Sequence, residues 1–177
     1  MKLFEKTLSK DYKYNGKILN MRVDEVELEN GKTAIREVVE HSGGVCVAAL
    51  DEENRLLMVR QFRYPYGEVL LEIPAGKREK DENPLECGKR ELEEETGYTA
   101  ERFTDLGKLY PTPAYVDEVI YMYYAENLTK THQHLDEDEF LSVERIPFDD
   151  AVKMVMNGEI RDAKTQVAIL KLKELIK

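Results

Sequence analysis

The sequence predicts an α/β protein: an α/β/α sandwich over a mixed sheet, with a small antiparallel β subdomain at the N-terminus. Three observations support this fold class. Residues 1–41 have the character of strands, residues 43–50 form a continuous apolar run, and one helical segment then separates these strands from further strands and two closing helices. That order is typical of helices packed on both faces of a sheet.

The first strands are marked by a turn signal. Asn30-Gly31 favours a two-residue hairpin, with residues 33–41 as the returning strand. Residues 43–50 (GGVCVAAL) are apolar throughout, as expected of a strand covered on both faces. After a turn at 51–54, two more strands are predicted, at residues 55–63 and 69–73.

A helix is predicted over residues 84–96. Asn83 can cap it, Pro84 suits its first position, and Glu86 would complete a capping box. Gly97 ends it. The remaining elements are strands at 101–110, 116–125 and 140–146, a Pro-containing loop at 110–115, and helices at 148–157 and from Asp162 onward.

Composition limits the possible functions. The chain has 177 residues, enough for one globular domain with a small subdomain, and we expect the division at 1–41 and 42–177. A net charge of -10 disfavours nucleic acid or an anionic membrane as a partner. The N-terminus lacks the apolar core of a signal peptide, and no apolar stretch is long enough to span a membrane. Cys46 and Cys87 are far apart in sequence, which fits reduced thiols and a cytoplasmic protein.

Three carboxylates share one face of the predicted helix. Glu91, Glu94 and Glu95 fall at i, i+3 and i+4. Each like-charge pair at this spacing costs ~0.2–0.5 kcal/mol. The negative end of the helix dipole adds roughly 0.3–1 kcal/mol for each anion there. A bound cation is therefore expected to stabilise the three carboxylates. A solvated acidic helix face is the simpler alternative.

Local details favour a metal site over a solvated face. The position four residues after Glu91 is another Glu rather than a Lys, and the bend Pro74-Ala75-Gly76 precedes the helix. Oxygen ligands suit Mg²⁺ or Mn²⁺, and the lack of nearby Cys or His disfavours zinc. Hard cations held by carboxylates point to phosphoryl chemistry, because they neutralise phosphate charge and activate water.

The same stretch resembles the Nudix box. Gly76, five residues, Glu82, seven residues and then residues 90–98 (RELEEETGY) match eight of its nine specified positions. The departure is Tyr98, where a small aliphatic residue is usual and where the side chain packs rather than reacts. Other segments resemble the ADP-ribose pyrophosphatase branch of the family: residues 36–41, 59–65 and 71–76, and Pro113 fifteen residues past the box.

The resemblance implies a role for each motif position. Glu91 and Glu95 are expected to bind Mg²⁺ directly, together with the carbonyl of Ala75, and Glu94 lies close by as a catalytic residue. The motif positions as a set are Gly76, Glu82, Arg90, Glu91, Glu94, Glu95 and Gly97. From the residues alone, Arg90 can bridge its acidic neighbours and hold the last helical turn together.

The resemblance also implies that an acidic loop supplies the water-activating base. The matching segment is residues 135–140 (LDEDEF), which makes Glu137 the expected base and Glu139 a further metal ligand. The assignment between these two can shift by one or two residues, and a solvated acidic turn is the alternative. The loop lacks the glycine and the spacing of an EF-hand.

Substrate contacts are expected from four residues. Arg36 and Arg63 lie on predicted strands, and the guanidinium fork suits a diphosphate, although a salt-bridged strand arginine is an equal alternative. By resemblance, Glu118 contacts the terminal ribose, and Glu72 faces the substrate or is structural. Tyr12 and Tyr14 belong to N-terminal strands that, in this branch, form a lid exchanged between the subunits of a homodimer.

The expected activity is the Mg²⁺-dependent hydrolysis of ADP-ribose to AMP and ribose 5-phosphate. Another nucleoside diphosphate sugar, such as GDP-mannose, is the closest alternative substrate. A Nudix domain that senses a nucleotide without cutting it is an alternative of a different class. It would predict losses among the box carboxylates, and these are all present.

Overall fold

The structure of the chain is a computed structural model that describes residues 3–137 and 139–176. The chain divides into two compact units, which are described separately. The first comprises Met1–Gly43 and Tyr110–Val119, and the second comprises Gly44–Leu109 and Ile120–Lys177.

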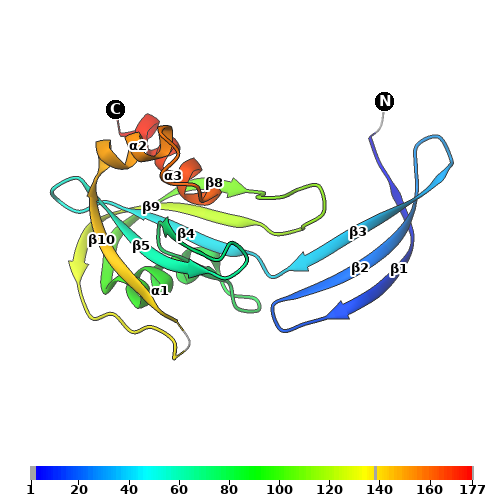
Figure 1. Cartoon of the computed structure of the whole chain (residues 1–177), viewed down its shortest axis with the longest axis horizontal. Helices are drawn as coiled ribbons and strands as arrows, with labels where there is room; N and C mark the ends of the chain where they lie inside the picture. Colours follow the sequence, from blue (N-terminus) through cyan, green and yellow to red (C-terminus); the bar gives the residue numbers. More distant parts are fainter. Residues whose placement is uncertain (1–2, 138, 177) are drawn as a thin grey trace. The chain divides into compact units, whose positions relative to one another are not determined.

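The elements follow one another in the order shown in Figure 1. They are β1 (Lys6–Asn15), β2 (Leu19–Glu27), β3 (Thr33–His41), β4 (Gly44–Ala49), β5 (Arg55–Arg63), β6 (Glu68–Glu72), β7 (Ala75–Lys77), α1 (Pro84–Thr96), β8 (Tyr98–Leu109), β9 (Ile120–Lys130), β10 (Leu141–Pro147), α2 (Phe148–Met156) and α3 (Ala163–Leu175).

The first unit is an antiparallel meander in the order β1-β2-β3. The predicted hairpin lies between β2 and β3, but its loop is longer than two residues, because the last strand pair is Glu27 with Thr33 and Leu28 N–H donates to the carbonyl of Lys32. Gly31 lies in this loop at φ +76°, a conformation that glycine adopts without strain. The loop over residues 110–119 is tied to β3, because Val39 N–H donates to the carbonyl of Tyr115 and Asp117 N–H donates to the carbonyl of Val39. All ten residues of β1 are exposed. The meander therefore has little core of its own.

The second unit holds two sheets, with strand orders β10-β5-β6 and β7-β4-β9-β8. β4 and β9 run parallel while their other neighbours are antiparallel, so the larger sheet is mixed. Figure 1 shows α1 on one side of these strands and α2 with α3 on the other. This confirms the predicted α/β/α sandwich with a mixed sheet.

β4 explains how both faces are filled. Its six residues are all buried, as its apolar sequence predicts. Cys46 and Ala48 belong to the larger core, which includes side chains of α2 and α3, whereas Val47 and Ala49 pack with Leu92 of α1. Successive residues of a strand point to opposite faces, so one strand supports helices on both sides.

The boundaries of α1 are as predicted, but its N-terminal cap is simpler than a capping box. The side chain of Asn83 accepts a hydrogen bond from Leu85 N–H at 2.9 Å, and Gly97 ends the helix in the left-handed conformation. Glu86 pairs with Lys89 instead, at 2.8 Å. A lysine one turn further along competes successfully for this exposed carboxylate.

Two strands differ from the sequence prediction. β9 covers Ile120–Lys130 rather than 116–125, because Val116 lies in the loop of the first unit and forms an isolated bridge with Val39 of β3. At its other end β9 continues through polar residues, since β8 begins at Tyr98 and pairs Tyr98 with Lys130. β7, three residues long, was not predicted as a strand. Within the described residues, no helix is long and apolar enough to cross a membrane.

The cap of α1 gives a first test. Replacing Asn83 with Ala removes the hydrogen bond to Leu85 N–H, and we expect it to lower the free energy of unfolding by ~1 kcal/mol. Asn83→Ser keeps an acceptor and is expected to stay close to the wild type in a urea titration. Equal losses in the two variants would contradict the capping role.

Candidate active site

The last turn of α1 carries the carboxylates into the interior. Leu92 is fully buried, and Gly88 allows a close approach to the sheet, because a Cβ there would lie only 3.2–3.4 Å from side chains of β4 and β9. With the helix held this close, Glu91 is 9% exposed and Glu95 is 1% exposed. These two side chains are therefore not part of a solvated acidic face.

β7 lies against the buried carboxylates of α1. A Cβ on Gly76 would lie 2.0 Å from the carboxyl carbon of Glu91, so only glycine leaves room for that carboxylate. The N–H of Ala75 donates to Oε2 of Glu95 at 2.9 Å. The Pro74-Ala75-Gly76 bend thus meets both buried carboxylates, with a backbone N–H observed at Glu95.

Arg90 bridges the acidic positions of the motif. It forms two bonds with Glu82, of 3.0 and 3.1 Å, and its Nη1 donates to Glu91 at 2.8 Å and to Glu94 at 2.9 Å. The hydrogen bonds from Arg90 lower the pKa of Glu82 to about 2. Arg90 therefore acts as the support that the sequence suggests, with a single positive charge shared among three carboxylates.

The carboxylates at the end of α1 exceed the positive charge that Arg90 supplies. Burial raises the pKa of Glu91 to about 7, with Arg90 opposing the shift, and burial raises the pKa of Glu95 to about 8. The charge of Glu139 also raises the pKa of both groups, which brings the acidic loop electrostatically into the cluster. Burying so many anions around one guanidinium is costly unless a further cation is bound.

The donor set fits a hard divalent cation. The groups are carboxylates, Glu91 occupies a space that a Cβ would fill, and the carboxylates outnumber the cations near them. Within the described residues, no three acidic, His or Cys side chains already form a cage for a metal ion. Nη1 of Arg90 donates to both Glu91 and Glu94, and Glu95 accepts from the N–H of Ala75.

The acidic loop contributes one well-placed residue. Gln61 of β5 donates to Glu139 at 3.3 Å, and burial raises the pKa of Glu139. Glu137 lies in an exposed turn of this loop, and Asp138 lies outside the described residues. Of the two loop glutamates, Glu139 is the one whose surroundings link it to the helix carboxylates.

Glu72 anchors a second ionic network. It is 1% exposed, receives two hydrogen bonds from Arg63 at 2.7 and 2.6 Å, and forms an ion pair with Lys164. Lys164 also bonds Asp162, the N-cap of α3, at 3.0 Å. These cations lower the pKa of Glu72 against the opposing effect of burial. Glu72 has a structural environment, and two donor groups of Arg63 are already engaged.

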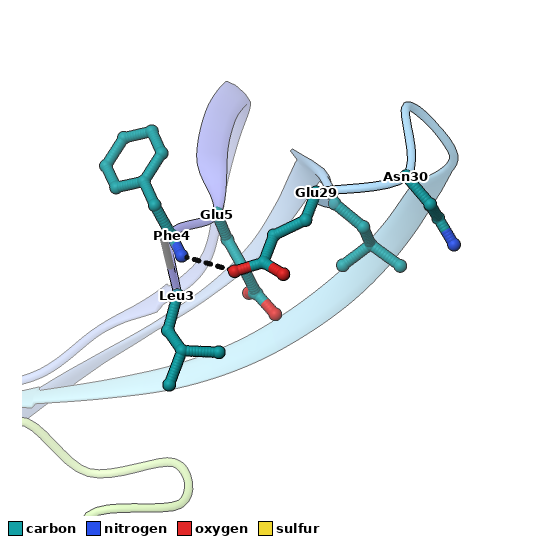
Figure 2. Close-up of a pocket in the computed structure, with 6 residues that line it drawn as sticks. Leu3, Phe4, Glu5, Glu29 and Asn30 are labelled. Atoms are coloured by element: carbon teal, nitrogen blue, oxygen red, sulfur yellow. Dashed lines mark hydrogen bonds between the residues drawn. The ribbon is translucent and has the colours of Figure 1, made fainter. Parts of the chain in front are cut away.

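Arg36 and Glu118 belong to the first unit. Arg36 pairs with Glu5 through two bonds of 2.9 and 2.5 Å, and Glu118 lies 3.3 Å from His41. Glu5 also helps to line a hollow of about 550 Å³ at the start of β1, shown in Figure 2, where Phe4 N–H bonds Glu29 at 3.1 Å. Tyr12 donates to Glu40 at 3.1 Å.

Sequence reasoning missed three residues of the second unit. The site includes hydrogen bonds from Lys164 to Glu72, from Gln61 to Glu139 and from Gln133 to the carbonyl of Glu95. All three donors lie outside the Nudix box, and isolated glutamines or lysines form no recognisable sequence motif. The only signal was the position of Lys164 two residues after the predicted cap, Asp162.

The fold and the site together define an α/β sandwich protein with a buried carboxylate cluster at the end of one helix. The NUDIX domain family matches residues 39–166, and the nucleoside diphosphate sugar hydrolase N-terminal domain matches residues 5–39. The chain belongs to the NUDIX domain family and is a Nudix hydrolase. Members of this family generally use divalent metal ions.

Two relatives match almost the whole chain. The ADP-ribose pyrophosphatase of Bacillus subtilis is 45% identical, with 98% of this chain and 96% of that protein covered. The methanol dehydrogenase activator of Bacillus methanolicus is 42% identical, with coverage of 99% and 98%. A solved structure described as an ADP compounds hydrolase shares the fold, with a TM-score of 0.88 at 21% identity over 99% of this chain and 96% of that one.

The raised pKa values predict a pH dependence in chelator. A carboxyl whose pKa is higher in the folded state contributes stability at low pH, and this stability is lost as pH rises through the folded pKa. We expect the free energy of unfolding of the metal-free protein to fall between about pH 5 and about pH 8. Glu95→Gln should reduce this fall, as measured by urea unfolding. The same pH slope in both proteins would contradict the buried, raised pKa of Glu95.

Gly76 gives a steric test. In Gly76→Ala the new Cβ must displace the carboxylate of Glu91, so we expect divalent cations to lose most of their stabilising effect on melting temperature. Because both changes act on one carboxylate, Gly76→Ala should add little to the effect of Glu91→Gln. Undiminished stabilisation of Gly76→Ala by cations would show that the carboxylate is not needed in its observed position.

Proposed function

We propose that this protein hydrolyses the diphosphate bridge of ADP-ribose with Mg²⁺, releasing AMP and ribose 5-phosphate. The observation that carries the proposal is the buried carboxylate cluster at the end of α1, which has an excess of negative charge and oxygen donors only. The identity of the substrate is supported by the relative of Bacillus subtilis, which is 45% identical over nearly the whole chain.

Each residue has a role in this proposal. Glu91, Glu95 and Glu139, with the carbonyl of Ala75, would hold the metal, and Glu94 lies beside them on the exposed side. A bound divalent cation would neutralise the charge on the diphosphate and make a water molecule more acidic. Mg²⁺ is the expected ion because it accepts a few carboxylates together with substrate phosphate oxygens.

A carboxylate of the acidic loop accepts a proton from the attacking water. Glu137 is the proposed base, since its side chain lies exposed in a turn where it can meet a bound substrate. The water oxygen adds to one phosphorus atom, the bridging P–O bond breaks, and the departing phosphate oxygen keeps the electron pair. One water is consumed, and the products are two phosphate monoesters.

The second ionic network positions the substrate side of the site. Glu72, itself paired with Lys164, holds Arg63 at the end of β5, where the Arg63 side chain remains partly exposed. We propose that Arg63 faces the diphosphate through the part of its fork that Glu72 does not use. Arg36 would contribute a second cation after exchanging Glu5 for a phosphate, and Glu118 would bind the terminal ribose.

A substrate panel tests the proposal directly. Purified protein is incubated with Mg²⁺ and ADP-ribose, GDP-mannose or other nucleoside diphosphate sugars, and the products are separated by chromatography. Glu91→Gln and Glu95→Gln serve as controls that should lose turnover by orders of magnitude while remaining folded. Preference for another sugar nucleotide would correct the substrate, whereas binding without products would favour a nucleotide sensor.

The roles of the loop glutamates can be separated. Glu137→Gln should lower kcat with little change in KM, because a base acts chiefly in the transition state. Glu139→Gln should instead raise the Mg²⁺ concentration needed for half-maximal activity. If the two phenotypes are exchanged, Glu139 is the base and Glu137 the metal ligand.

We also propose a homodimer in which each N-terminal meander completes the partner's substrate site, and a cytoplasmic location consistent with two buried free cysteines. The support is the first unit itself, where β1 is fully exposed and apolar side chains such as Leu8, Tyr14 and Ile35 lie open. A three-stranded meander with so little buried apolar surface needs a further surface to pack on.

The dimer has a clear signature. Light scattering should give twice the chain mass at micromolar concentration, because obligate interfaces of this kind bury ~2,000 Å² or more. Deleting residues 1–41 should abolish dimer and activity together. A full-length protein that is monomeric and fully active would rule out a shared site.

A further inference from the structure

The C-terminal end of α1 is covered by the segment Thr131–His134, which follows β9. The last carbonyls of a helix have no partner within the helix and need donors from elsewhere. Here Thr131 N–H donates to the backbone carbonyl of Gly97 at 2.7 Å, and His134 N–H donates to the backbone carbonyl of Glu94 at 3.0 Å. The side chain of Gln133 donates to the carbonyl of Glu95 at 2.6 Å.

Gly97 makes this contact possible. A Cβ at Gly97 would lie 2.8 Å from the backbone nitrogen of Gln133, and the residue has φ +69°. Glycine is therefore required both to end the helix in the left-handed conformation and to let the segment approach. The motif glycine thus links the helix to a segment more than thirty residues later in the chain.

The contact joins two parts of the proposed catalytic site. Glu94 and Glu95, whose carbonyls accept the hydrogen bonds, carry two of the carboxylates of α1. Glu137 lies only three residues after His134, so the anchor limits it to a range of roughly 10 Å at ~3.3–3.6 Å per residue. On the far side, Gln61 bonds Glu139. Glu137 therefore follows an anchored segment closely in sequence, and Glu139 has an anchor of its own.

We propose that Gln133 is a positioning residue that fixes the acidic loop on the end of α1, so that Glu137 and Glu139 meet the carboxylates of the helix. This inference rests on the proposed hydrolase function. Among the three hydrogen bonds of the segment, that of Gln133 alone comes from a side chain, so a substitution removes it without changing the backbone groups. Its donor also lies at the negative end of the helix dipole, where positive character is favourable.

A series of variants at Gln133 tests the donor. Gln133→Ala should lower kcat about three- to tenfold, the population change expected for the loss of one side-chain hydrogen bond. Gln133→Glu should be lower still, because a carboxylate cannot donate and is repelled by the helix end. Gln133→Lys retains a donor with a positive charge and should keep kcat near the wild type, with KM little changed throughout the series.

A matched control is available in the same unit. Gln166 donates from its amide to the carbonyl of Ile160 at 2.7 Å, close to the start of α3. Gln166→Ala removes a similar hydrogen bond away from the acidic loop and should leave kcat unchanged. An equal loss of kcat in Gln133→Ala and Gln166→Ala would overturn the proposal, since it would indicate a general loss of stability.

A double-mutant cycle identifies the route of the effect. If Gln133 acts through the loop, its removal should cost little further kcat in the Glu137→Gln background, or in Glu139→Gln if that residue is the base. Independent, multiplying losses in both backgrounds would contradict the inference.

Hydrogen exchange provides a readout that needs neither metal nor substrate. The His134 amide and those of residues 135–137 should exchange about three- to tenfold faster in Gln133→Ala than in Gln166→Ala. Unchanged exchange would overturn the inference whatever the activity. If the wild type hydrolyses nothing while exchange rises as expected, the proposed function fails and the structural coupling stands.

Discussion

The arrangement of this protein depends on burying carboxylates at the negative end of a helix. Glu91 and Glu95 lie in the last turn of α1 and have almost no access to solvent. The helix dipole opposes this placement. Burial, with repulsion from neighbouring carboxylates, also opposes it and raises the pKa of each group. A bound cation would offset this cost, which is why the cluster supports the proposed divalent metal site.

Neighbouring residues make the placement sterically and electrostatically possible. Gly88 brings α1 close to the sheet, Gly76 leaves space for a carboxylate, and Gly97 ends the helix where another segment can bind its carbonyls. Arg90 neutralises part of the charge. Close packing of the backbone at these glycines holds the carboxylates in place, and the proposed metal and substrate would need such precise positioning.

A second set of charges surrounds the cluster. Glu72 is buried, yet its pKa is lowered, because Arg63 and Lys164 both contact its carboxylate. Glu95 differs from Glu72 in this respect. Both side chains are about 1% exposed, and only the one without direct cationic partners has a raised pKa. Direct cationic partners thus distinguish the carboxylate of Glu72 from that of Glu95, which we propose as a metal ligand.

The sequence by itself determined the elements that depend on local signals. The hairpin at Asn30-Gly31, the buried strand β4, the limits of α1 and the shared face of its three carboxylates all follow from turn chemistry, periodicity and caps. Only the tertiary structure decided which polar groups meet across long separations. Lys164 as a partner of Glu72, the N–H donor at Glu95 and the anchor of the acidic loop come from residues 20 to 92 positions away. Such pairings are fixed by the packing of sheets and helices, and the residues involved leave no periodic pattern in the chain.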